Sequence, residues 1–247
     1  MPETGALPDG WRLASFASLD STNDEALRRI DSGEDPGLVI VADSQRGGRG
    51  RRGAVWQSAP GNLFMTMVVA VPTGNMPGQL AFVAGLAAAD AIRFCAGQDV
   101  HLKWPNDVML EGRKLGGILI EAGSREGLYA VGVGLNVTVS PWETETPATA
   151  LAEFGDCPPR DRLVAAICNA FAERLHLWLE TGFVAIRRDW LAVAFGLGRP
   201  LHARLADGTE ERGLFSAVDE TGALVLQRED GTDLVLSAGA VFFDEGC

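Results

Sequence analysis

The most chemically distinctive segment of the sequence is a basic loop that runs from Asp43 to Gly53. It contains four arginines and four glycines, in a chain whose formal net charge is -12. Guanidinium groups present forks of N–H donors that match phosphate and carboxylate oxygens, and glycines give the backbone unusual conformational freedom. The composition predicts a mobile loop that binds an anion. A solvated surface loop is the alternative for a basic segment this short.

A second group of polar residues lies between residues 100 and 121. The chain there reads as a strand, a corner fixed by Pro105, a second strand, a two-residue turn at 111–112 and a returning strand. Trp104 precedes the proline and is therefore biased to extended geometry, which makes the corner rigid. A simple turn is the alternative reading. The polar residues of this corner and its hairpin that we single out are Lys103, Asn106, Asp107 and Lys114.

The elements beside the basic loop decide what kind of anion site it forms. Residues 38–42 are a short apolar run that predicts a buried strand ending at the loop. Gly48, Gly50 and Gly53 have the spacing of a dinucleotide fingerprint, but that fingerprint must open a helix. Residues 63–71 read instead as a strand. We therefore expect arginines, rather than a helix N-terminus, to hold any phosphate.

Other elements follow from periodicity and turn signals. Thr22 and Glu25 form a capping-box pattern that predicts a helix through Ile30, so helix capping is the alternative role for Ser21 and Thr22. The interior of one predicted strand contains Gly132 and Gly134, where glycine weakens pairing unless something approaches the backbone closely. The remaining segments are a weakly alternating stretch at 11–19, helices at 79–96, 160–180 and 183–195, and the strand at 127–139.

The character of the chain changes near Gly198. Short strands follow, separated by turn signals at 207–208, 221–222 and 230–231, which is typical of a small antiparallel barrel. We therefore divide the chain into a domain of residues 1–197 and a domain of residues 198–247. Arg187 and Arg188, on the helix before this boundary, are expected on a solvated face.

Composition excludes several classes of protein. A length of 247 residues with 47% hydrophobic content supports a substantial core, and a pI near 4.7 argues against a surface that docks broadly on nucleic acid. The four cysteines and three histidines show neither disulfide nor zinc-site spacing. The N-terminus lacks a signal-peptide pattern and no apolar run approaches the length of a membrane span. We expect a soluble cytoplasmic protein without a membrane partner.

Taken together, these segments closely resemble the biotin protein ligase family. The resemblance rests on Ser21-Thr22-Asn23, on Gln45 with Gly48–Gly53 and Trp56, on Lys103–Asp107, on Arg113–Ile118 and on Gly132–Asn136. It implies an α/β (α+β) fold: a mixed central sheet flanked by helices, similar to class II aminoacyl-tRNA synthetases, plus a small SH3-like β-barrel domain at the C-terminus. It also implies that ATP activates biotin to biotinyl-5'-AMP, and that biotin then passes to a lysine of a biotin carboxyl carrier protein domain.

The resemblance further implies roles for individual residues. Arg51 and Lys114 would act in catalysis by contacting the biotin carboxylate and the α-phosphate. The other biotin-binding positions are Ser21, Thr22, Gln45, Gly48, Arg49, Gly117, Gly132 and Gly134. The nucleotide-binding positions are Arg49, Arg52, Trp56, Lys103, Asn106, Asp107 and Asn136, and Asp107 is also the candidate ligand for Mg²⁺.

The basic loop would then serve as a lid. Covering the adenylate protects it from hydrolysis until the carrier lysine arrives. Arg49 and Arg52 would help to hold the closed loop or the phosphates, and Trp56 would cover the adenylate unless it is a core aromatic. Gly132 and Gly134 would leave room for the rings of the ligand. We expect the loop to be disordered without ligand.

Three features depart from the family pattern. Relatives that also repress transcription carry a winged helix-turn-helix, for which the early Ser-Thr-Asn motif leaves no room, so we expect no DNA binding. Ala150 stands where a serine is common on the adenine side. Residues 240–244 lack the basic residue that some relatives use to reach the nucleotide, which argues against contact between the small domain and ATP.

Other functions remain open at this level. The nearest alternative is a lipoate ligase or octanoyltransferase of the same fold, but the basic loop and the segment 103–107 favour biotin over lipoate. A nucleic-acid binder with Arg-Gly repeats would need stacking aromatics and a basic groove, neither of which is evident. A biotin sensor without catalysis would not need Arg51 and Lys114. A homodimer formed through a sheet edge is possible, as in relatives.

Overall fold

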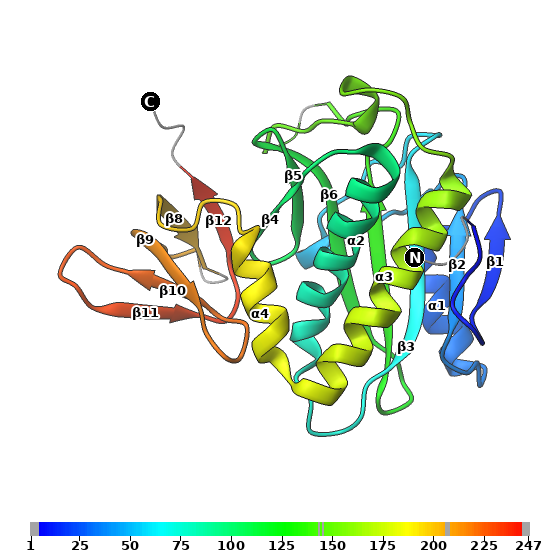
Figure 1. The fold of residues 1–247 in the computed structure, drawn as a ribbon, viewed down its shortest axis with the longest axis horizontal. Coiled ribbons are helices and arrows are strands. Elements are labelled where there is room, and N and C mark those ends of the chain that lie inside the picture. Colours follow the sequence, from blue (N-terminus) through cyan, green and yellow to red (C-terminus); the bar gives the residue numbers. More distant parts are fainter. Residues whose placement is uncertain (1–4, 143, 145, 206–207, 244–247) are drawn as a thin grey trace.

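The computed structural model describes residues 5–142, 144, 146–205 and 208–243. The strands of its larger sheet are β1 (Arg12–Phe16), β2 (Leu38–Ala42), β3 (Leu63–Ala70), β4 (His101–Lys103), β5 (Asp107–Leu110), β6 (Arg113–Ala122) and β7 (Leu128–Leu135). They lie in the order β1-β2-β3-β7-β6-β5-β4 (Figure 1). β1 and β2 are parallel, whereas the other neighbouring pairs are antiparallel. The sheet is therefore mixed, as the sequence predicts.

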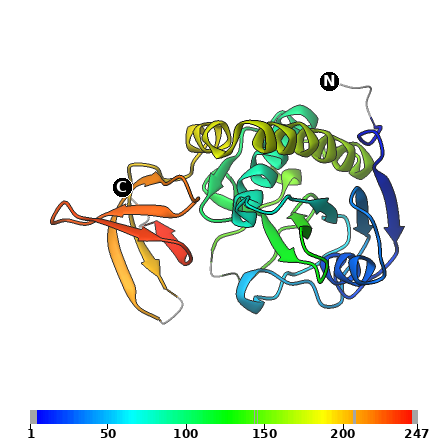
Figure 2. The ribbon, with the colours of Figure 1, turned by 90° about the horizontal axis from the view of Figure 1, so that it is seen from below.

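Helices cover both faces of this sheet (Figure 2). They are α1 (Thr22–Asp31), α2 (Leu80–Ala96), α3 (Arg160–Thr181) and α4 (Phe183–Ala192). Because successive side chains of a strand point to opposite faces, Ile40 and Val41 pack into different hydrophobic clusters. Ile40 packs in one cluster with Ala26 and Ile30 of α1, and Val41 belongs to the larger cluster that includes α2 and α3. The sheet is the middle layer between α1 and the α2–α3 pair.

The helix α2 is central to the larger core. The segment Pro77–Ala96 is long and apolar enough to cross a membrane, which corrects the expectation that no apolar run approaches that length. Of its most apolar window, 61% is buried inside this fold. Gly85 faces the side chain of Leu102, so the absence of a side chain lets α2 approach β4 closely. In this structure the segment is a core helix.

A second, smaller sheet follows α4. Its strands are β8 (Pro200–Arg204), β9 (Glu210–Val218), β10 (Leu224–Gln227), β11 (Asp233–Leu236) and β12 (Ala240–Phe243), in the antiparallel order β11-β10-β9-β8-β12. The predicted turns at 221–222 and 230–231 join successive strands, and Asp207 of the third predicted turn lies outside the described residues. The mixed α/β architecture with a small β domain at the C-terminus is confirmed.

Hydrogen bonds fix the smaller sheet to the rest of the fold. Trp104 Nε1 donates to the carbonyl oxygen of Gly222 at 3.0 Å. Arg187 Nε donates to the carbonyl oxygen of Val218. Arg187 is half-buried, so its predicted place on a solvated face is wrong, whereas Arg188 is exposed. The contact of Trp104 connects the smaller sheet directly to the predicted corner at Pro105.

Candidate active site

One cavity of about 490 Å³ brings together most of the residues that the sequence predicts to bind ligands. It lies between the N-terminus of α1, the basic loop, the corner between β4 and β5, and strands β6 and β7. The predicted site residues border it except Gly48 and Asn136. Asn136 borders a neighbouring cavity of about 190 Å³. The predicted residues thus come together in space from five separate parts of the chain.

The N-terminus of α1 is tied to the beginning of the basic loop. Ser21 is the N-cap, and its hydroxyl accepts from the amide of Asp24. The capping position predicted at Thr22 is therefore wrong by one residue. The amide of Thr22 donates instead to Gln45 Oε1 at 2.8 Å, and Gln45 Nε2 donates to Ser58 Oγ at 3.1 Å. Gln45 therefore satisfies a helix amide that the cap leaves without an intrahelical partner.

Asn23 is a buried residue of this site to which the sequence analysis gives no role. Its Oδ1 accepts from Thr66 Oγ1 at 2.6 Å, and its Nδ2 donates to Glu121 Oε2 at 2.8 Å. A Cβ atom on Gly132 would overlap the amide of Asn23. Gly132 therefore makes room for a protein side chain in this structure, where the sequence led us to expect the ring of a ligand.

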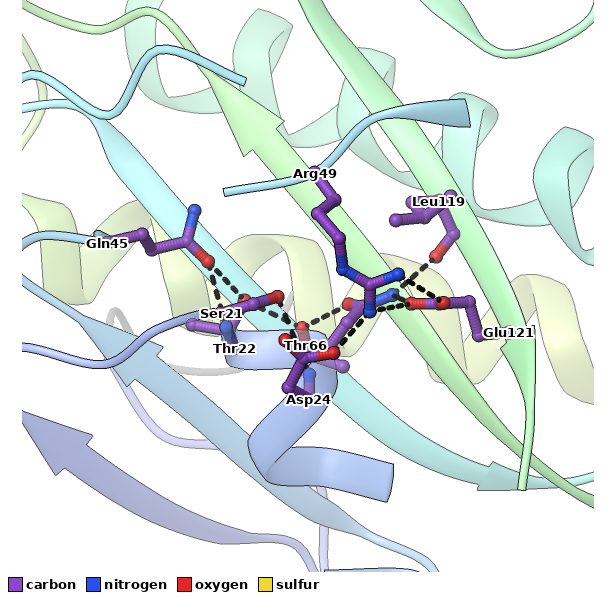
Figure 3. Close-up of polar contacts among 9 residues, drawn as sticks. Ser21, Thr22, Asp24, Gln45, Arg49, Thr66, Leu119 and Glu121 are labelled. Carbon is purple, nitrogen blue, oxygen red and sulfur yellow. Dashed lines mark hydrogen bonds and ion pairs between the residues drawn. The ribbon is translucent and has the colours of Figure 1, made fainter. Parts of the chain in front are cut away.

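Arg49 points from the basic loop to two carboxylates (Figure 3). Its Nη1 lies 3.1 Å from Glu121 Oε1, and its Nη2 is paired with Asp24. Burial alone would lower the pKa of Arg49, but Glu121 and Asp24 outweigh it and raise the pKa above its ordinary value. The sequence analysis missed both acids. Strand alternation could have found Glu121, which shares a face of β6 with Gly117 and Leu119.

Arg51 and Arg52 lie in a single 3₁₀ turn, Arg51–Gly53, from which the chain continues to β3 without opening an α-helix. This confirms that the glycine spacing is not a dinucleotide fingerprint. Arg51 Nη1 lies 3.4 Å from Asn106 Oδ1. Burial lowers the pKa of Arg51, Arg52 lowers it further, and Asp107 opposes them. A partly desolvated cation beside a like charge favours an anionic ligand.

The corner between β4 and β5 is fixed by two hydrogen bonds between Asn106 and the main chain of Ile118. Asn106 Nδ2 donates to the Ile118 carbonyl at 2.7 Å, and the amide of Ile118 donates to the Asn106 carbonyl at 2.9 Å. The predicted two-residue turn at 111–112 is confirmed, with positive φ at both residues. Lys114 Nζ lies 2.7 Å from Asp107 Oδ1. The hairpin thus presents a paired cation and carboxylate on a rigid frame.

Trp56 borders both cavities. A Cβ atom on Gly134 would lie 2.8 Å from the Trp56 ring, and Lys114 Nζ lies 5.8 Å from the ring centroid. Within the described residues, Trp56 Nε1 and Asn136 Oδ1 are buried without a hydrogen-bond partner. A buried polar atom without a partner is costly, so a ligand that pairs with these atoms would bind favourably.

The smaller sheet also contributes to the larger cavity. Arg204 of β8 and Phe242 of β12 both border it, and the Arg204 guanidinium carbon lies 4.9 Å from the Phe242 ring centroid. Lys103 Nζ lies 5.6 Å from the same centroid. The small domain therefore reaches the site, although β12 itself brings no basic residue to it. Arg204 comes from the neighbouring strand, so the sequence of β12 could not indicate it.

Metal-ligating and redox-active groups do not gather elsewhere in the part of the chain that the structure describes. No group of three or more His, Cys, Asp or Glu side chains that could hold a metal ion occurs among residues 5–142, 144, 146–205 and 208–243. Cys95, Cys157 and Cys168 are free thiols, and Cys247 lies outside these residues. Burial raises the pKa of Cys168 to about 12, which makes it an unreactive core thiol.

Comparison with known proteins gives a consistent result across the chain. Residues 15–138 match the model of the Biotin/lipoate A/B protein ligase family, and residues 196–244 match the Biotin protein ligase C terminal domain. Together these two matches include both sheets, apart from residues 12–14 of β1, and all the predicted site residues.

Individual relatives are similar over nearly their whole length. A biotin--[acetyl-CoA-carboxylase] ligase from Paracoccus denitrificans is 39% identical, over 92% of this chain and 99% of the relative. A second ligase of this description, from Mycobacterium tuberculosis, is 34% identical over 94% of this chain and 89% of the relative. The solved biotin protein ligase from Aquifex aeolicus in complex with biotin and ATP superposes with a TM-score of 0.83 and 26% identity, over 94% of this chain and 99% of that chain.

Proposed function

Because this chain belongs to the biotin protein ligase family, we propose that the two cavities form the site at which it activates biotin and transfers it. The enzyme converts biotin and ATP into biotinyl-5'-AMP and pyrophosphate, then passes biotin to a lysine of a biotin carboxyl carrier protein domain. In the first step the biotin carboxylate attacks the α-phosphorus, and the bond to pyrophosphate breaks. In the second step the lysine nitrogen attacks the acyl carbon, AMP leaves, and the amine loses a proton.

The observation that carries this proposal is the meeting of two cations from separate elements in one cavity. The first step brings two anions together, so positive charge fixed at their meeting point lowers the barrier. Lys114 reaches the cavity from β6, and Arg51 reaches it from the basic loop. We assign both to the biotin carboxylate and the α-phosphate. Each charged hydrogen bond contributes about 1.5 to 3 kcal/mol.

We assign the biotin side of the site to the N-terminus of α1 and the neighbouring loop. The ureido ring of biotin has two N–H donors and one carbonyl acceptor. Hydroxyl and amide groups can serve both kinds of partner, and Ser21, Thr22 and Gln45 bring such groups to the cavity. The main chain at Gly117 borders the same space. Gly48 does not border the cavity but leaves room for the side chain of Gln45, since a Cβ atom at position 48 would lie 3.0 Å from Gln45 Nε2.

We assign the nucleotide side to the region around Trp56. The amino group of adenine donates hydrogen bonds, so the unpaired Asn136 Oδ1 is a suitable acceptor. The face of the Trp56 ring suits stacking on a flat base. Lys103 and Arg52 border the cavity and add positive charge for the phosphates.

Mg²⁺ fits the nucleotide side through Asp107. This ion usually keeps several waters and takes one or two carboxylates together with phosphate oxygens. Asp107 borders the cavity and brings one carboxylate, which matches an ion that arrives with the nucleotide. When bound, Mg²⁺ supplies positive charge for the pyrophosphate that leaves. Asp107 also orients Lys114 through its ion pair.

We propose the division into a catalytic domain of residues 1–197 and an SH3-like domain of residues 198–247. The second domain takes part in the site, because Arg204 and Phe242 border the same cavity as Lys114. Contact between Phe242 and the cations Lys103 and Arg204 supports a role on the nucleotide side.

We further propose a cytoplasmic enzyme whose macromolecular partner is the carrier domain. A net charge of -12 disfavours binding to DNA or to anionic membranes. The strand β1 lies at one edge of the larger sheet, and an unpaired strand edge can join a second copy. We therefore propose a homodimer through β1, which sedimentation at several protein concentrations would test.

The decisive experiment is the exchange of labelled pyrophosphate into ATP in the presence of biotin. We expect exchange with biotin, and little with lipoate, octanoate or no acid. Mass spectrometry of a biotin carrier domain should then show one biotin added to a single lysine. Exchange with lipoate and none with biotin would overturn the proposal.

A further inference from the structure

We propose that Asp24 and Glu121 are positioning residues that hold Arg49 and thereby keep the lid closed over the adenylate. The lid is the hairpin of residues 48–56. This inference rests on the proposed function, since it concerns the retention of that intermediate. It also selects among the roles expected of Arg49, because the guanidinium pairs with these two carboxylates and so holds the closed loop rather than biotin or nucleotide.

The contacts of Arg49 occupy both terminal nitrogens of its guanidinium group. Nη1 lies 3.1 Å from Glu121 Oε1, Nη2 lies 3.3 Å from Glu121 Oε2, and Nη2 also pairs with Asp24 (Figure 3). The two acids belong to different elements, α1 and β6. Their combined field raises the pKa of Arg49, in spite of a burial that would lower it. The carboxylates of Asp24 and Glu121 thus both bind the guanidinium group of Arg49.

Glu121 is held in position by residues outside the lid. Its Oε2 accepts from Asn23 Nδ2, and Asn23 Oδ1 accepts from Thr66 Oγ1 of β3. Asn23 and Thr66 are buried, and Gly132 leaves room for the Asn23 amide. Since Asn23 also belongs to the N-terminus of α1, the carboxylate is fixed to the same elements that form the biotin side.

The lid needs such an anchor because its main chain pairs mostly with itself. The amide of Trp56 donates to the Gly48 carbonyl, the amide of Gly50 donates to the Ala54 carbonyl, and Arg49 forms an isolated bridge with Val55. These bonds shape the hairpin but do not attach it to the sheet. Side chains such as Arg49 provide that attachment.

The strength of this attachment suits a lid that must open again. The side chains of Arg49 and Asp24 are 40% and 47% exposed, and ion pairs this exposed are weak. The closed state is therefore favoured only modestly, so a carrier domain can reach the adenylate. Removal of one carboxylate should speed release of bound adenylate about fivefold, within the range for such pairs.

The experiment measures how long the enzyme retains labelled biotinyl-adenylate in the absence of carrier. We expect Glu121→Gln, Asp24→Asn and Arg49→Gln each to shorten retention by about three- to tenfold, given the strength of exposed ion pairs. Glutamine at position 121 keeps the acceptor for Asn23. Glu34→Gln is the matched control, because Glu34 pairs with Arg12 and Arg29 and with no residue of the lid. Its retention should equal that of the wild type.

A double-mutant cycle separates an anchor from a ligand contact. If Arg49 acts through the two acids, Arg49→Gln combined with Glu121→Gln should release adenylate no faster than Arg49→Gln alone. Salt near 0.5 M should shorten retention more in the wild type than in Arg49→Gln, because ion pairs between solvent-exposed side chains are weakened by salt. Additive effects, or a rise in KM for biotin that only Arg49→Gln shows, would overturn the proposal.

Hydrogen exchange provides a readout that does not require catalysis. The anchor implies a lid that is ordered in the ligand-free protein, in place of the disorder expected from its glycines. Without ligand, the lid amides should therefore exchange faster in Glu121→Gln and Asp24→Asn than in the wild type or Glu34→Gln. Equal exchange in all four would contradict the anchor even if biotin is activated as proposed. Faster exchange would support the anchor even if pyrophosphate exchange showed a different acid as substrate.

Discussion

The basic loop and the hairpin of residues 103–114 bring cations to the same cavity, but different forces hold them. The hairpin is part of a continuous sheet: β5 pairs with both β4 and β6, and Trp104 at its corner is hydrogen-bonded to the smaller sheet. The basic loop depends more on side chains, with Gln45 at its beginning and Arg49 in the lid. The hairpin is therefore held by the pairing of strands in the sheet, whereas the basic loop is attached to the sheet mainly by side-chain contacts.

This difference assigns different tasks to the hairpin and the basic loop. A group that stabilises charge in the transition state must be fixed before the reaction begins, which favours Lys114 on the hairpin. A group that covers an intermediate must be able to move away, which favours Arg49 and Arg51 on the loop. We therefore expect changes in the hairpin to affect chemistry or stability, and changes in the loop to affect retention of the adenylate.

The largest effect is expected at Lys114. Lys114→Ala removes the cation that the hairpin brings to the site. It should slow biotin-dependent pyrophosphate exchange by about 100- to 1,000-fold, the effect typical of enzymes that lose one preorganised hydrogen-bond donor to the transition state. Arg113→Gln is the control, since Arg113 precedes Lys114 on β6 but pairs with Glu153. A Lys114→Ala enzyme with near-normal exchange would remove the distinction between the hairpin and the basic loop.

The next effect concerns the stability of β6, the strand that continues from the hairpin. A Cβ atom on Gly116 would lie 2.5 Å from the Gly134 carbonyl oxygen, and main chain cannot easily move aside. Gly116→Ala should lower the free energy of unfolding by about 1 to 3 kcal/mol. Thermal unfolding would show this as a lower Tm. Gly78→Ala, where the new Cβ atom meets nothing within 4 Å, should leave the Tm nearly unchanged.

A smaller effect is expected at Arg51. Arg51→Ala removes a loop cation that is only partly satisfied by Asn106, so the main consequence should be leakage of adenylate into solution. We expect the ratio of released adenylate to transferred biotin to rise about tenfold, equivalent to about 1.4 kcal/mol. A pulse of labelled biotin with and without carrier domain measures this ratio. Unchanged retention would contradict the role of the loop as a lid.

The smallest effect is expected from a steric change inside the lid. In Gly48→Ala the new Cβ atom would lie 2.8 Å from the Trp56 carbonyl oxygen, whereas in Gly50→Ala its nearest neighbour is at 3.6 Å. Gly48→Ala should therefore shorten adenylate retention about threefold, a shift below about 1 kcal/mol, and Gly50→Ala should not. A loss of Tm in Gly48→Ala as large as in Gly116→Ala would show that the lid is as integral to the fold as β6.

Local sequence predicted the order and type of the elements well. Apolar runs located β2 and β3, and the Glu111-Gly112 turn located the β5–β6 hairpin, because both signals depend on nearby residues. The capping position was off by one residue for a physical reason. Ser21 and Thr22 both fit capping patterns, and the choice depends on Gln45, which lies far along the chain and accepts from the amide of Thr22.

The sequence predicted which residues border the site better than it predicted the contacts between them. The pairing of Arg49 with Asp24 and Glu121 joins three distant segments, so no local spacing encodes it. The space at Gly132 is filled by Asn23, whose role depends on how closely α1 approaches β7. Arg204 reaches the cavity through the placement of one sheet against another. Such contacts depend on tertiary packing, which local propensity does not determine.

The position of Trp56 has a consequence for how the enzyme can be observed. Trp178 and Trp190 are fully buried in the core away from the cavities, so their surroundings stay constant, whereas Trp104 is buried but borders the larger cavity. Trp56 lies between the two cavities with its indole N–H unpaired. Its emission should therefore change when a ligand enters and return when the ligand leaves. The protein thus contains its own optical probe of occupancy, so loading and discharge of the site can be timed without an attached dye.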